Sequence, residues 1–206
     1  MGKNAKAQEC TQCGDLIYYN GNNPCCVGYE DKDTIGQFDQ ILEASRDEAI
    51  HYVKNAFDVI ADRVSASTTV PFESIRDIAQ HDLDFHAAIW YASTEILPAL
   101  EVQVVIDSNN NCHVSTGSSG FVSFTTSPVG LKLPVRCWIH THPFGSAYFS
   151  GTDWSTVNAW LPLMDTAYVL GGEHHYGFWE QSKPNELIIT TRDNNVIQYQ
   201  NRGEEE

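Results

Sequence analysis

The chain has 206 residues, of which 42% are hydrophobic and 11% aromatic, and its mass is 23.0 kDa. This is enough apolar material for one folded domain, with or without an appendage, and it excludes wholesale disorder. The formal net charge of −15 argues against nucleic acid and anionic lipid as partners, because Lys and Arg bind their phosphates. No apolar run approaches the ~20 residues of a membrane-spanning helix, and residues 1–6 are polar, unlike a signal peptide. We therefore expect a soluble, cytoplasmic protein without a membrane span.

The acidic side chains are concentrated in the middle of the chain. Residues 30–101 contain 15 acidic and 5 basic residues, whereas residues 102–206 contain 10 and 5. This distribution is typical of a solvated helical face or of a docking surface for a basic partner. It says little about chemistry in the second half of the chain.

Four cysteines lie near the start of the chain. Cys10 and Cys13, followed by a glycine, form the Cys-x-x-Cys turn that opens many zinc knuckles. Cys25 and Cys26 supply a second pair, although adjacent cysteines converge on one ion less readily. A structural zinc on these four residues is one interpretation, and free thiols or disulfides are the other. Disulfides are disfavoured in a reducing cytosol.

Two helices are predicted before residue 100. Between residues 34 and 64, apolar side chains recur at steps of three and four, as on a helix with one buried stripe. The stripe consists of Ile41, Ile50, Val53, Phe57, Ile60 and Val64. A second helical run is expected from Ser74 to Leu97, and Pro98 ends it because proline has no N–H to donate.

From Glu101 onward the period of the sequence changes to that of strands. Strands are expected at 102–106, 112–116, 121–125, 136–140, 167–170, 176–179, 187–191 and 196–199, with a helix at 154–163. We predict an α/β fold with a largely antiparallel sheet. The expected organisation is a Cys-rich segment at 1–33, a helical extension at 34–72 and the main domain at 73–206.

One segment of the main domain has the residues of a metal site. His140 and His142 are two positions apart on an extended segment, so their side chains point the same way. Asp153 follows eleven residues later, at the expected start of a helix, and can complete the set. Two histidines, one carboxylate and an open fourth position are the arrangement of a catalytic zinc site. The alternatives are an ordinary strand edge for the histidines and a helix cap for Asp153.

The spacing His-x-His-Pro followed by Ser-x-x-Asp resembles the motif of the JAMM (MPN+) metallopeptidase family. It is formed by His140, His142, Pro143, Ser150 and Asp153, and the flanking residues look closest to the endosome-associated deubiquitinases of that family. The resemblance covers residues 80–200 and implies an MPN-like (cytidine-deaminase-like) mixed sheet flanked by helices. It also implies that His140, His142 and Asp153 bind zinc and that Ser150 hydrogen-bonds the oxyanion. Ser150 could instead be only a turn or cap residue.

The family also uses an upstream glutamate as general base. Glu101 opens a strand three residues after Pro98, Glu95 lies within the predicted second helix, and Glu73 begins that helix. We favour Glu101, because a carboxylate at the start of a strand has a fixed direction toward the neighbouring strand. The short gap between Glu101 and His140 departs from the family pattern, and Glu95 remains the alternative.

The resemblance implies zinc-dependent hydrolysis of a peptide or isopeptide bond, with a ubiquitin-like protein or its conjugate as partner. Residues 73–206 would then be the catalytic domain, with one catalytic zinc and the four cysteines as sites for a second, structural zinc. Two alternatives remain: a hydrolase of the same type acting on another amide or small-molecule conjugate, and a non-catalytic scaffold of the same fold. Three convergent ligands argue against the scaffold, which has no need of them.

Overall fold

The computed structural model describes residues 7–9, 16–18, 32–66, 82–117, 130–190, 193 and 195–200. The chain divides into two compact units, Met1–Glu43 and Ala44–Glu206. In the first unit, β1 (Ala7–Glu9) pairs antiparallel with β2 (Leu16–Tyr18). The four N-terminal cysteines lie outside the described residues, so both interpretations of them stay predictions.

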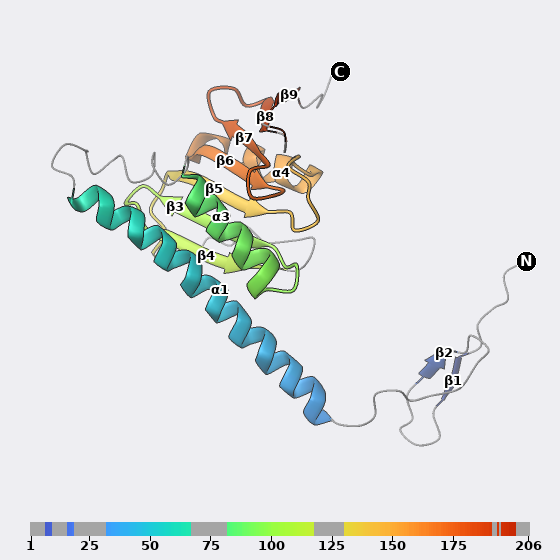
Figure 1. Cartoon of the computed structure of the whole chain (residues 1–206). Coiled ribbons are helices and arrows are strands. Elements are labelled where there is room, and N and C mark those ends of the chain that lie inside the picture. The colour runs from blue at the N-terminus through green and yellow to red at the C-terminus, as the bar shows by residue number, and fades with distance from the viewer. Residues whose placement is uncertain are drawn as a thin grey trace, which may run out of the picture. The chain divides into compact units, whose positions relative to one another are not determined.

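A seven-stranded mixed sheet organises the second unit, with the strand order β4-β3-β5-β6-β7-β8-β9 (Figure 1). Neighbouring strands are antiparallel except for β5 and β6, which are parallel. The strands are β3 (Val102–Asp107), β4 (Cys112–Thr116), β5 (Val135–Thr141), β6 (Met164–Leu170), β7 (Tyr176–Glu180), β8 (Glu186–Thr190) and β9 (Val196–Gln200). The predicted α/β class is confirmed in this form.

Helices cover both faces of the sheet. On one face lie α1 (Lys32–Ala66) and α3 (Leu83–Tyr91) (Figure 1). Their side chains Val53, Phe57 and Ile89 belong to one buried cluster with Val104 and Ile139 of the sheet. On the other face, α4 (Gly151–Trp160) crosses from β5 to β6 and packs against a second cluster of buried side chains. This connection is the helical crossover that a parallel strand pair requires. All six residues of β3 are buried because the sheet is covered on both sides.

The predicted helices are confirmed in part. The apolar stripe of α1 is buried at Val53, Phe57, Ile60 and Val64, but Ile41 is 65% exposed, so its assignment to the stripe was wrong. Ile41 belongs to the first unit and has no part in the core of the second. The second helix was expected as one regular run. It consists of α3 followed by a π-helical turn, η1 (Ala92–Ile96), and its predicted start lies outside the described residues.

The strand predictions agree with the structure to within a few residues at each end, wherever that part of the chain is described. Residues 112–116 form β4 as expected, β8 begins one residue before its predicted start, and the other predicted strands that the structure describes are longer than predicted by one to three residues. The expected helix at 154–163 begins earlier, at Gly151, and ends as a 3₁₀ turn, η2 (Leu161–Leu163). The strand expected at 121–125 lies outside the described residues.

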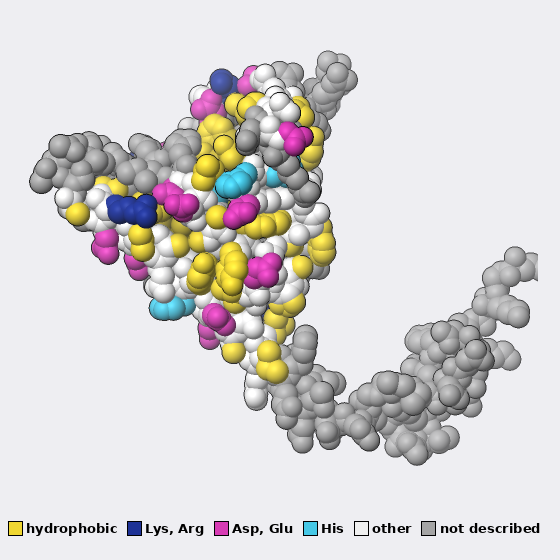
Figure 2. All heavy atoms as spheres, viewed as in Figure 1, with side chains coloured by type: hydrophobic (Ala, Val, Ile, Leu, Met, Phe, Trp, Pro, Cys, Tyr) yellow, Lys and Arg dark blue, Asp and Glu magenta, His cyan; other side chains and the backbone are white. Residues whose placement is uncertain are grey.

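The surface of the second unit mixes acidic and apolar side chains. On the face seen in Figure 2, acidic groups are scattered among exposed hydrophobic ones. Within the described residues, no helix is long and apolar enough to cross a membrane.

A buried carboxylate ties the turn between β3 and β4 to the segment before β5. Asp107 is fully buried and accepts hydrogen bonds from the backbone N–H groups of Asn109, Asn111 and Lys132, at 2.8, 3.0 and 3.1 Å. It also accepts from the Asn111 side chain at 2.9 Å and lies 3.2 Å from His113 Nε2. Burial opposes ionisation, but these bonds outweigh it and lower the pKa of Asp107.

The Asp107→Asn variant tests this anchor. An amide cannot accept all of these bonds, and its NH₂ group would face backbone donors, so we expect a loss of about 2 kcal/mol in the free energy of unfolding at pH 7. Because folding lowers the pKa of Asp107, its contribution is complete above the unfolded value near ~4 and is lost as pH falls through the native value. Urea unfolding of both proteins from pH 7 downward should therefore show their difference shrinking below about pH 4. A difference independent of pH would contradict this role.

Candidate metal centre

The two histidines are placed by the end of the central strand β5. His140 lies in β5 and His142 directly follows it, with the His142 N–H bonded to the carbonyl of Leu170 at 2.8 Å. Alternation along the extended chain puts both imidazoles on the α4 side of the sheet, and Thr141, between them, on the other. Their ring centroids are 5.0 Å apart. The strand predicted at 136–140 is therefore confirmed as part of β5.

The third group comes from the first turn of α4. Ser150 is the N-cap of this helix: its Oγ accepts from the Asp153 N–H at 3.2 Å, and Asp153 Oδ2 accepts from the Ser150 N–H at 2.6 Å. This reciprocal capping box satisfies two N–H groups that the helix start would otherwise leave unpaired. It also fixes the direction of the Asp153 carboxylate, which points to the histidines.

The three side chains converge at ligand distances. His140 Nε2 lies 3.2 Å from Asp153 Oδ1, and His142 Nε2 lies 3.4 Å from Asp153 Oδ2. One potential ligand atom from each residue lies within 4.8 Å of the others. Tetrahedral ligands at ~2.0–2.2 Å from a zinc ion are ~3.4 Å apart, so the spacing is compatible with a single ion.

The surroundings of His140 fit a metal ligand. Its Nε2 atom is buried and makes no hydrogen bond of ordinary geometry. A buried imidazole nitrogen that faces a carboxylate without a well-formed hydrogen bond is costly, and a cation bound between Nε2 and Asp153 would remove that cost. Two imidazole nitrogens and a carboxylate oxygen also form a donor set that zinc accepts. The residues present therefore fit a metal ion.

The electrostatics of the cluster depend on the charge of Asp153. Burial opposes ionisation of this carboxyl, yet its contacts with His140 and His142 hold its pKa well below the usual range. Burial lowers the pKa of His140. For His142 burial acts in the same sense, but Asp153, Glu101 and a backbone hydrogen bond with Ser146 raise its pKa overall. The carboxylate is thus ionised, as a metal ligand must be.

Aromatic side chains enclose the buried histidine. The Trp138 ring stacks on His140 with centroids 4.3 Å apart, and Phe149 lies 5.9 Å away. Trp138 Nε1 donates to Gln103 Oε1 at 3.0 Å, and Gln103 Nε2 donates to Ser115 Oγ at 3.3 Å. Gln103 was not singled out from the sequence. A polar residue in a fully buried strand, two positions after a candidate base, is the signal that could have found it.

The loop from His142 to Ser150 packs closely against the neighbouring strands. A Cβ added to Gly177 would lie 2.3 Å from the Ala147 carbonyl oxygen, and one added to Gly171 would lie 2.6 Å from the Ser146 carbonyl carbon. Both glycines are therefore needed for this close approach. The loop nevertheless exposes Phe144, which is 77% accessible and lies two residues after His142.

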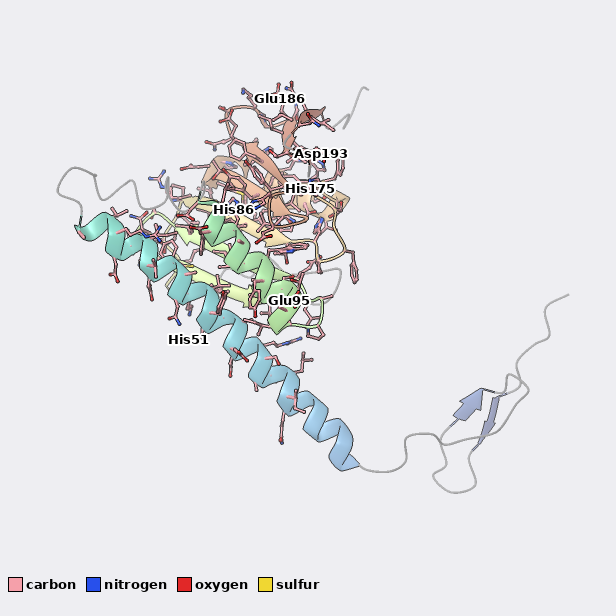
Figure 3. All side chains as sticks on the ribbon, in the orientation of Figure 1. His51, His86, Glu95, His175, Glu186 and Asp193 are labelled. Atoms are coloured by element: carbon pink, nitrogen blue, oxygen red, sulfur yellow. The ribbon has the colours of Figure 1, made fainter. Side chains whose placement is uncertain are left out.

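The structure places two of the candidate general bases, Glu101 and Glu95, in different surroundings. β3 and β5 pair in the register that places Gln103 opposite His140, and the Glu101 position is therefore opposite His142, on the same face. Glu101 is 6% exposed, and its charge acts on His142. Glu95 is exposed, in η1, which follows a helix that packs on the opposite face of the sheet (Figure 3). Glu73 lies outside the described residues.

Comparison with family models, with curated proteins and with solved structures found no match to this chain. The site therefore rests on its own geometry. This geometry brings together three side chains, His140, His142 and Asp153, that can bind a metal ion.

Zinc content tests the site directly. We expect His142→Ala and Asp153→Ala to lose one equivalent of zinc relative to the unaltered chain, because each removes one of three ligands. The exposed His174 is a matched control, and His174→Ala should retain all of the bound zinc. Zinc would be measured by mass spectrometry of the metal after dialysis against a weak chelator. Full retention in both ligand variants would rule out this site.

The capping box makes a separate prediction about stability. Ser150→Ala should lower the free energy of unfolding of the metal-free protein by about 1 kcal/mol, because the Asp153 N–H loses its acceptor. Ser150→Thr retains the hydroxyl and should remain within a few tenths of the parent value. Urea unfolding in the presence of a chelator measures both. Equal stability of the alanine and threonine variants would contradict the role of Ser150 as a cap.

Proposed function

We propose that this protein is a zinc-dependent hydrolase of peptide or isopeptide bonds, the activity of the JAMM metallopeptidases that its sequence resembles. The observation that carries the proposal is the convergence of His140, His142 and Asp153 at ligand distances, with a buried glutamate facing the same site. Among the described residues three side chains form this group, and three protein ligands would leave a coordination position open, as catalytic zinc sites do and closed structural sites do not.

Each residue of the site has a chemical task in such a reaction. When bound, zinc would polarise the scissile carbonyl and lower the pKa of water toward ~7. Glu101, buried opposite His142, would accept the proton that the attacking water loses and return it to the departing amine. The Ser150 hydroxyl, beside Asp153, would donate a hydrogen bond to the oxyanion of the tetrahedral intermediate. Trp138 and Phe149 would keep bulk water away from His140.

The proposed substrate is a ubiquitin-like protein joined through its C-terminal tail to a lysine. The support for this class is the sequence resemblance. The loop after His142 adds to it, because an anchored loop with an exposed aromatic side chain offers an extended tail an apolar contact beside the scissile bond. The acidic surface suits a basic partner.

The general base is tested by comparing two variants at equal zinc content. Glu101→Gln should reduce kcat by about 10²–10⁴-fold, because the amide cannot accept a proton. Glu95→Gln is the matched control and should leave kcat within about twofold, because Glu95 is exposed on another element. The assay would measure release of a fluorogenic C-terminal amide from a panel of ubiquitin-like proteins. A Glu101→Gln variant that remained as active as the unaltered chain would exclude Glu101 as the base.

A further inference from the structure

A chain of buried hydrogen bonds encloses the backbone at Glu101. The Val102 N–H donates to Thr141 Oγ1 at 2.9 Å, and the Thr141 hydroxyl donates to Ser93 Oγ at 2.9 Å. The Ser93 hydroxyl in turn donates to the Leu100 carbonyl oxygen at 2.6 Å. Ser93 and Thr141 are fully buried. Each hydroxyl accepts one bond and donates the next, so the chain runs in one direction, and its members reinforce one another.

The two ends of this chain hold the two peptide units that flank Glu101. The Leu100 carbonyl belongs to the unit before the Glu101 Cα atom, and the Val102 N–H belongs to the unit after it. The Gly117 N–H holds the second unit as well, through a bond of 2.8 Å to the Glu101 carbonyl. Because peptide units are planar, fixing both of them fixes the backbone dihedrals at Glu101 and hence the direction of its Cβ.

The hydrogen-bond chain connects three elements whose relative positions matter for the proposed reaction. Thr141 lies between the two histidines on β5, Ser93 lies in η1, and Glu101 immediately precedes β3. η1 is a π-helical turn, a rare conformation that is frequent at functional sites. Ala99, between η1 and Glu101, has a φ of 57°, a left-handed conformation that is unfavourable for a residue other than glycine. The segment that leads to Glu101 is thus held in an unfavourable conformation by its surroundings.

The two hydroxyls satisfy the buried Val102 N–H and the Leu100 carbonyl, and in doing so they fix the backbone on both sides of Glu101. We propose that Ser93 and Thr141 are positioning residues, which hold the Glu101 carboxylate toward the metal site. The inference rests on the proposed function, because it assigns these hydroxyls a role that acts through the proposed base. Neither hydroxyl is assigned contact with substrate or metal.

Zinc affinity gives a readout of this role that does not depend on activity. The negative charge of Glu101 acts on the His142 region and therefore favours a cation there, by an amount that depends on where the carboxylate lies. We expect Thr141→Val to weaken zinc binding by about tenfold, as found for groups that orient a metal site. Thr141→Ser retains the hydroxyl and should restore affinity to within about twofold. Affinity at the His140 site would be measured by competition with a chromophoric chelator, using the loss in His142→Ala to identify that site.

A double-mutant cycle separates positioning from a direct effect on the histidines. In the Glu101→Gln background, Thr141→Val should cost less than about twofold, because the charge that it positions is already gone. An equal loss in both backgrounds, or no loss in either, would overturn the inference. Ser93→Ala removes the same chain at its other end and should give the same pattern, which protects the test if Thr141→Val folds poorly.

A second threonine of the same π-helical turn is the matched control. Thr94 Oγ1 donates to the Trp90 carbonyl at 3.1 Å, within its own helix and outside the chain to Glu101. Thr94→Val should leave zinc affinity unchanged in both backgrounds. Amide hydrogen exchange should show faster exchange of the Val102 N–H in Thr141→Val and not in Thr94→Val. If the unaltered protein bound no zinc at the His140 site, the proposed function and this inference would both be wrong. If zinc bound there but the effects of Thr141→Val and Glu101→Gln were independent, only this inference would be wrong.

Discussion

The register between β3 and β5 is the constraint on which the site depends. It pairs Gln103 with His140, and continuing the pairing to the residue beyond each strand puts Glu101 opposite His142 on the same face of the sheet. A slip of one residue would turn Glu101 and Gln103 to the other face, away from both histidines. Burial on both faces opposes such a slip, because β3 packs against α1 and α3 on one side and the α4 cluster on the other. The Trp138 bond to Gln103 and the Val102 bond to Thr141 form only in this register.

The start of α4 shows how one residue can serve folding and chemistry together. Asp153 uses Oδ2 to cap the helix and directs both of its oxygens toward the histidines. The cap therefore sets the position of the ligand before any ion arrives, which reduces the ordering cost of binding. Ser150 has the same two roles, because its hydroxyl accepts the reciprocal capping bond and lies beside the proposed reaction centre. Preorganisation here comes from ordinary helix capping.

The sequence predicts the parts of the site that depend on local periodicity. Alternation along a strand is enough to pair His140 with His142, and cap chemistry is enough to place Asp153 at a helix start. It favours Glu101 over Glu95 only through the position of Glu101 at the start of a strand, because the face of the sheet that each element covers depends on the tertiary fold. The Ser93–Thr141 hydrogen bond could not be predicted, since a contact across 48 residues leaves no local pattern in the sequence. Ile41 was misassigned because its helical spacing continues beyond the part of α1 that packs on the sheet.

We propose that His140, His142 and Asp153 bind one zinc ion and leave one coordination position open. An anomalous difference map, from crystals of the full chain grown with zinc and measured at the zinc absorption edge, tests it most directly. We expect a peak ~2.0–2.2 Å from Nε2 of both histidines and from one Asp153 oxygen, with no fourth protein ligand. A map without a peak among these three residues, or one with a fourth protein side chain coordinating the ion, would contradict the account.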